Sequence, residues 1–181
     1  MFATSHDDIR TEQWWRDYVA ELESGADHHV TVFFRSLTPH SGSHDGRARL
    51  VERLESAVQT NVLNGYDARI LGGEICLCGT CQSLQPARDV LETARELSGW
   101  RNAGLTSAGF TEREVDCSFT GEEYRVLAPP ETTVGVYLDG TLSGVFPCAA
   151  GDSYYSVQSY LHALPDEPAW GEGSRIRQRV R

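Results

Sequence analysis

The 181-residue sequence contains no lysine. All 16 of its basic residues are arginine, against 26 aspartates and glutamates, and the net charge is -10. Lysine is normally among the commonest residues, so its complete absence is unusual. At a salt concentration of 1 M the Debye length falls to roughly 3 Å, so surface carboxylates repel one another little, while a high net charge keeps a chain soluble. The composition therefore predicts a protein of a halophile.

The sequence also lacks a long apolar run. Its most apolar stretch, Val30–Phe34, is far shorter than the roughly 20 residues that cross a bilayer. The first eight residues have neither the basic nor the apolar region of a secretory signal. Five cysteines are an odd number and do not suit the disulfide framework of an exported domain. We therefore expect a cytoplasmic protein with reduced thiols and no membrane association.

Common catalytic motifs are missing as well. The sequence has no H-E-x-x-H, no G-x-S-x-G, no P-loop and no G-x-G-x-x-G. Its histidines form no ligand motif. A hydrolase, a kinase or a nucleotide-binding enzyme is therefore unsupported, and the sequence favours a protein that is not an enzyme.

Charge and apolar patterning divide the chain into three parts. Residues 1–28 form an extension with an amphipathic, Trp-rich helix near Thr11–Leu22; residues 29–165 form one α+β domain; residues 166–181 form a flexible, Arg-rich tail. The helix either packs on its own domain or anchors a homodimer or protein partner. Tryptophan often anchors interfaces, so Trp14 and Trp15 are the candidate partner-binding residues.

The central domain alternates strands and helices. The expected strands are His29–Arg35, Tyr66–Ile75, Phe110–Cys117, Glu123–Ala128, Thr133–Leu138 and Thr141–Phe146, and the expected helices are Gly46–Thr60, one beginning near Pro86, and Ser153–Leu164. Asp139–Gly140 predicts a tight hairpin between the last two strands. The order is βαβα, then antiparallel strands and a C-terminal helix. This predicts an α+β fold with helices packed mainly on one face of the sheet.

Three closely spaced cysteines are the densest candidate site. Cys76 and Cys78 project to the same side of a strand because side chains alternate, and the turn to Cys81 folds a third sulfur toward them. A structural zinc ion takes four ligands, usually Cys or His. The candidates for the fourth ligand are Cys148, Cys117, His40 and His44. The sequence does not choose among them, and we name Cys148 with the three.

The same residues support a redox interpretation. Cys78 and Cys81 form a Cys-x-x-Cys pair ahead of a helix, whose N-terminus can stabilise a thiolate. The later order of strand, Asp-Gly hairpin and helix resembles the second half of a thioredoxin-like domain, which implies a dithiol redox role. Inert, buried cysteine is the remaining interpretation, above all for Cys117 and Cys148.

Arginines in two segments are candidate nucleic-acid contacts. Arg47, Arg49 and Arg53 lie on the first helix of the domain, where Glu52 and Glu55 can instead pair with them and leave a solvated, salt-bridged face. The tail supplies the second group, Arg175, Arg177, Arg179 and Arg181.

Several strings together resemble one known family. They are Val32–Pro39, Arg49–Glu55, Ser118–Tyr124, Pro129–Pro130 and Tyr137–Cys148. As a set they are similar to a family of haloarchaeal proteins described as a presumed helix-turn-helix domain, over about residues 29–165. The resemblance implies transcriptional regulation through DNA and brings no catalytic residues with it.

We therefore expect a non-enzymatic, intracellular, halophilic regulator that binds DNA or a protein partner. The alternative is a zinc-binding or thiol-redox sensor that uses the cluster of Cys76, Cys78 and Cys81.

Overall fold

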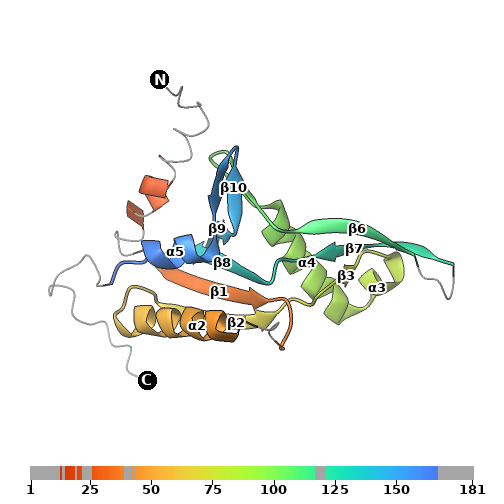
Figure 1. Cartoon of the computed structure of the whole chain (residues 1–181), viewed down its shortest axis with the longest axis horizontal. Helices are drawn as coiled ribbons and strands as arrows, with labels where there is room; N and C mark the ends of the chain where they lie inside the picture. Colours follow the sequence, from red (N-terminus) through yellow and green to blue (C-terminus); the bar gives the residue numbers. More distant parts are fainter. Residues whose placement is uncertain are drawn as a thin grey trace.

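The computed structural model describes residues 13, 15–18, 20–21, 26–38, 42, 44–116 and 121–166. These residues form helices together with parallel and antiparallel strands, so the predicted α+β class is confirmed (Figure 1). The described residues between 13 and 21 are helical, as expected for the N-terminal helix. Trp14 and the four tail arginines lie outside the described residues. No helix in the described part of the chain is long and apolar enough to cross a membrane.

Four strands form the central sheet in the order β2-β1-β8-β9. β1 (His28–Phe34) is parallel to β2 (Gly65–Ile70) and antiparallel to β8 (Thr132–Leu138). β8 joins β9 (Thr141–Phe146) through Asp139 and Gly140, whose φ angles are 49° and 80°. Two successive positive φ angles are what a type I′ turn requires, so the predicted Asp-Gly hairpin is confirmed.

Three helices cover this sheet. α2 (His44–Gln59) connects β1 to β2, α4 (Gln85–Gly99) lies between β2 and β8 in the sequence, and α5 (Val157–Ala163) follows the hairpin. The expectation of helices mainly on one face holds for α2 and α5, whereas α4 lies on the opposite face.

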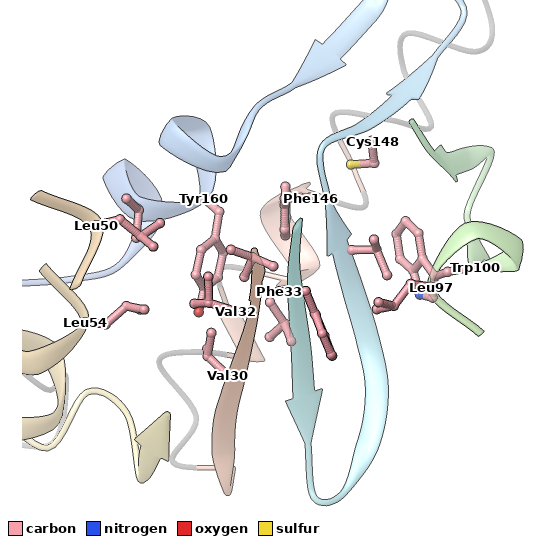
Figure 2. Packing of buried hydrophobic residues seen from close by; sticks show 14 of the residues in the cluster. Val30, Val32, Phe33, Leu50, Leu54, Leu97, Trp100, Phe146, Cys148 and Tyr160 are labelled. Atoms are coloured by element: carbon pink, nitrogen blue, oxygen red, sulfur yellow. The ribbon is translucent and has the colours of Figure 1, made fainter. Parts of the chain in front are cut away.

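Buried side chains mark the two faces of the sheet. Figure 2 shows Leu50, Leu54 and Tyr160 on the side of β1 where α2 and α5 pack, and Leu97 and Trp100 on the other side. All five side chains are at most 7% exposed. The core therefore has two apolar layers, one on each side of the central sheet.

Two smaller sheets flank the centre. One has the order β11-β10-β5-β4, from Ser153–Tyr155, Cys148–Ala150, Leu105–Ser107 and Arg101–Asn102. The other has the order β3-β7-β6, from Ile75–Cys76, Glu123–Ala128 and Thr111–Asp116. Figure 1 shows β6 and β7, which we call the ribbon, extending away from the central sheet. β6 has no buried residue, as expected for a solvent-facing edge strand.

Two expected elements differ from the observed ones. The strand expected over Tyr66–Ile75 is divided into β2 and β3 by a bend in which Gly72 has a φ of 97°. The helix expected over Ser153–Leu164 is shorter, because its first residues pair with β10 and Ser156 caps the helix that follows. A short helix not expected from the sequence, α3 (Gly79–Ser83), precedes α4.

A buried polar pair joins β1 to α5. His28 is 1% exposed, and its Nε2 lies 3.0 Å from the hydroxyl of Tyr160, which is fully buried. Burial lowers the pKa of His28 to about 4, and the neighbouring His29 adds to the effect. His28 is therefore neutral at neutral pH and contributes a hydrogen bond to the core rather than a charge.

Replacing Leu54 with alanine should lower the free energy of unfolding by about 2–5 kcal/mol, because Leu54 is fully buried and its truncation leaves a cavity in the core. The matched control is Leu37→Ala, since Leu37 is 81% exposed, and it should change stability by less than about 0.5 kcal/mol. Urea denaturation of both variants measures the difference. Equal losses would contradict the assigned core.

Acid should destabilise the protein through His28. The unfolded state binds a proton at the ordinary histidine pKa, 6.5, whereas the folded state does so only near 4. Stability is therefore full above pH 6.5 and is lost as the pH falls toward 4, by roughly 2–3 kcal/mol from this group. Urea denaturation at several pH values should show a shallower loss in His28→Gln than in a control, His162→Gln, which changes an exposed histidine.

Candidate functional site

Three thiols converge where the ribbon meets the helices. Cys76 ends β3, Cys78 is the residue that caps the N-terminus of α3, and Cys81 lies within α3. Their Sγ atoms all lie within 4.8 Å of one another, and all three residues are partly exposed. The structure thus brings together the three sulfur atoms that the spacing of the sequence grouped.

Backbone amides hold two of these sulfur atoms. The N–H of Cys78 donates to Cys76 Sγ, and the N–H of Cys81 donates to Cys78 Sγ, both at 3.4 Å. The bond from the Cys81 backbone, with further bonds from the thiols of Cys76 and Cys81, lowers the pKa of Cys78 to about 7. Hydrogen bonds with the Cys78 and Cys76 sulfurs raise the pKa of Cys81 to about 11. Cys78 is therefore the thiol of this pair that ionises first.

The structure does not bring Cys148 to the cluster. Cys148 is fully buried in β10, where its neighbours across the strands are Ser107 and Tyr155, and burial raises its pKa to about 12. His44 opens α2 and is exposed, while His40 and Cys117 lie outside the described residues. Within the described ranges, no further Cys, His, Asp or Glu joins the three cysteines.

Arg47 is engaged by its own domain. Its guanidinium donates to the carbonyl oxygens of Ser36 at 2.9 Å and Leu37 at 3.2 Å, and pairs with Glu131 at 3.0 Å. The same group lies over the ring of Phe34, 4.6 Å from its centroid. Arg47 therefore ties the loop after β1 to α2 and to the segment before β8.

Arg53 is also used internally. Its Nη2 donates to the carbonyl oxygen of Leu164 at 2.7 Å and pairs with Asp166 at 3.1 Å. Leu164 is the residue that ends α5. Arg53 thus satisfies a free carbonyl at that end and fastens the last described residue of the chain to α2.

Arg49 differs from its two neighbours on α2. It is exposed, and the part of the chain described by the structure offers it no ion pair. Of the predicted nucleic-acid contacts, Arg49 is thus the only described one that projects into solvent. The tail group of arginines lies beyond Asp166, outside the described ranges.

Trp15 packs within the chain. Its ring stacks on Tyr155 with centroids 5.2 Å apart and meets the edge of Phe146 at 6.1 Å. Tyr18, one turn later, is 2% exposed and lies 6.3 Å from Tyr160. The described part of the N-terminal helix is therefore docked on the domain through its aromatic residues.

A polar hollow, which was not predicted from the sequence, lies on the face of the sheet that carries α4. The hollow has a volume of about 420 Å³, and in it His29 Nε2 lies 3.1 Å from Asp67 Oδ2. A Cβ at Gly65 would come within 3.2 Å of the His29 ring, so glycine leaves room for it. The polar residues around this hollow are Asp27, His29, Thr31, Asp67, Arg69, Thr93, Glu96 and Tyr137. In the sequence, the available signal for this hollow was the alternation of side chains along β1 and β2, which places every second residue of a strand on the same face of the sheet.

The fold and the site define an α+β domain with a partly exposed thiol cluster. Residues 22–169 match the model of a family described as a helix-turn-helix domain. The chain belongs to this family, as the sequence strings implied. No curated protein and no solved structure gave a significant match.

The topology differs from what the family description suggests. A helix-turn-helix unit joins two helices through a turn of three or four residues. Here α2 is followed by β2, while α3 has only five residues and is joined to α4 through Leu84 alone. Residues 44–116 and 121–166 contain no such unit.

Replacing Arg47 with alanine should lower the free energy of unfolding by about 1–3 kcal/mol, because it removes hydrogen bonds to two loop carbonyls and the pair with Glu131. Arg49→Ala, on the same helix, should change it by less than about 0.5 kcal/mol. Thermal and urea denaturation measure both. If the two variants lose the same stability, the structural role of Arg47 is wrong.

Proposed function

We propose that the chain is a non-enzymatic regulatory protein that acts by binding DNA in the salt-rich cytoplasm of a halophile. Membership of the helix-turn-helix domain family, over residues 22–169, is the observation that carries this proposal. The absence of lysine and the net charge of -10 support the halophilic setting.

The DNA-facing residues of this proposal are one exposed arginine of α2 and the arginines of the C-terminal segment. Arg49 projects from α2, and Asp166, where the described chain ends, is held beside the same helix by Arg53. A tail that leaves from this point starts close to Arg49. The ribbon is a poor candidate, because its two strands carry more acidic than basic residues and phosphates would repel them. We therefore assign DNA contact to Arg49 together with Arg175, Arg177, Arg179 and Arg181.

A second candidate function is thiol-based sensing. The observation that favours it is the convergence of three sulfur atoms within 4.8 Å at a partly exposed position. Such a cluster can bind a thiophilic metal ion or form a disulfide. The two functions are compatible, because thiol sensing would receive the signal and DNA binding would produce the response.

Chromatin pull-down at native salt should recover enriched DNA sites with the full-length protein. Changing Arg49 and the four tail arginines to glutamine should abolish the enrichment. In a binding assay over a range of salt concentrations, every phosphate contact that these substitutions remove should reduce the salt slope by roughly 0.9. Arg101→Gln, which changes an exposed arginine on β4, is the matched control and should leave both readouts unchanged. A pull-down without enriched sites would count decisively against DNA binding.

A further inference from the structure

We propose that Cys76, Cys78 and Cys81 bind one zinc ion through three thiolates and leave its fourth coordination position open to a small exogenous ligand. This inference rests on the thiol-sensing candidate and is independent of DNA binding. The cluster lies at the junction of β3, α3 and the ribbon, away from the arginines of α2.

The spacing of the sulfur atoms suits a single zinc ion. Zinc–sulfur bonds of about 2.3 Å in a tetrahedral arrangement place the sulfur atoms about 3.8 Å apart. All three Sγ atoms already lie within 4.8 Å of one another. Side-chain movements of up to about 1 Å therefore complete the coordination, and thiolates are the donors that zinc favours.

The local backbone is built to carry the charge of bound thiolates. The N–H groups of Cys78 and Cys81 point at Cys76 Sγ and Cys78 Sγ. Hydrogen bonds from outside the coordination shell orient metal ligands and tune the metal. The side chain of Gln82 donates to the carbonyl oxygen of Leu77 at 2.6 Å, which holds the turn between the first two ligands.

The site differs from a closed structural zinc centre. Structural sites use four protein ligands, whereas sites with three protein ligands keep a position for water or a substrate. In the described ranges the cluster consists of these three cysteines, all partly exposed, and Gly79 and Thr80 beside them are exposed. An open fourth position makes the ion accessible to exchange and to a thiol or another small anion.

Zinc occupancy would also act on the ribbon. Cys76 is paired with Val126 of β7, and the N–H of Leu77 donates to the carbonyl oxygen of Arg125 at 2.8 Å. Cys81 belongs to α3, which packs on α4. An ion bound by both cysteines therefore links the ribbon to the helices. Zinc should slow amide hydrogen exchange at Leu77, Cys78 and Cys81.

The test uses the reduced, full-length protein, purified without metal-affinity resin and titrated with Zn²⁺ against a chelator. We expect one zinc per chain and a loss of affinity of at least about 100-fold in Cys78→Ser, more than removal of an outer-shell partner causes. Cobalt substitution should give thiolate-to-metal absorption that weakens in the same variant. Circular dichroism checks that the variant is folded, and hydrogen exchange of the unaltered chain gives a readout that needs no variant.

The control variant is Cys117→Ser, which removes the remaining cysteine near the ribbon in the sequence. Unchanged zinc affinity supports the open position, and a loss comparable to that of Cys78→Ser overturns it. Fewer than about 0.2 zinc ions per chain at saturating Zn²⁺ overturns the inference.

The same protein preparation also shows whether a failure to bind zinc disproves thiol sensing as well. Oxidised glutathione can convert Cys78 and Cys81 to a disulfide and is itself reduced to two glutathione thiols. If this disulfide forms but zinc does not bind, the zinc inference is wrong and thiol sensing stands. If neither occurs, both are wrong.

Discussion

The rest of the structure depends on the burial of β1 between two strands and two helical layers. β1 is paired with β8 along its full length and with β2 from His29 to Phe34. Val30 and Val32 are at most 1% exposed, and Phe33 is 3% exposed. A strand enclosed in this way cannot shift by one residue without turning its apolar side chains to the wrong face. Its register therefore fixes α2 and α5 on one side, α4 on the other, and the long connection from β2 to β8 that carries the thiols.

Elements specified by local sequence could be predicted, and elements specified by distant partners could not. Asp139–Gly140 determines its own turn, and Pro86 suits the first turn of α4, so both were visible in the sequence. Ser153–Tyr155 followed a helical pattern but forms a strand because β10 is available for pairing. The same distinction holds at the site. The spacing of Cys76, Cys78 and Cys81 predicts their convergence, whereas the position of Cys148 depends on the fold of a separate sheet.

The arginines show why charge counts say little about function in this chain. Arg47 and Arg53 were, with Arg49, candidate nucleic-acid contacts on α2, but both donate to backbone carbonyls and pair with carboxylates. Arginine suits such roles because its planar group donates several hydrogen bonds and stays charged. A family description is similarly limited, because function resides in particular residues and their geometry rather than in the fold as a whole. Here the proposals rest on the partly exposed thiol cluster and on the exposed Arg49.

The contact between Arg53 and Asp166 has a consequence for chain geometry. It fixes the starting point of the last 15 residues beside α2, and a segment of that length can reach at most about 50 Å. Whatever conformation the segment takes, any group on it stays within about 50 Å of this point. Its effective concentration there is set by covalent attachment and does not depend on how much protein is present. Two individually weak contacts, one on α2 and one on the tail, can therefore act as a single bivalent surface.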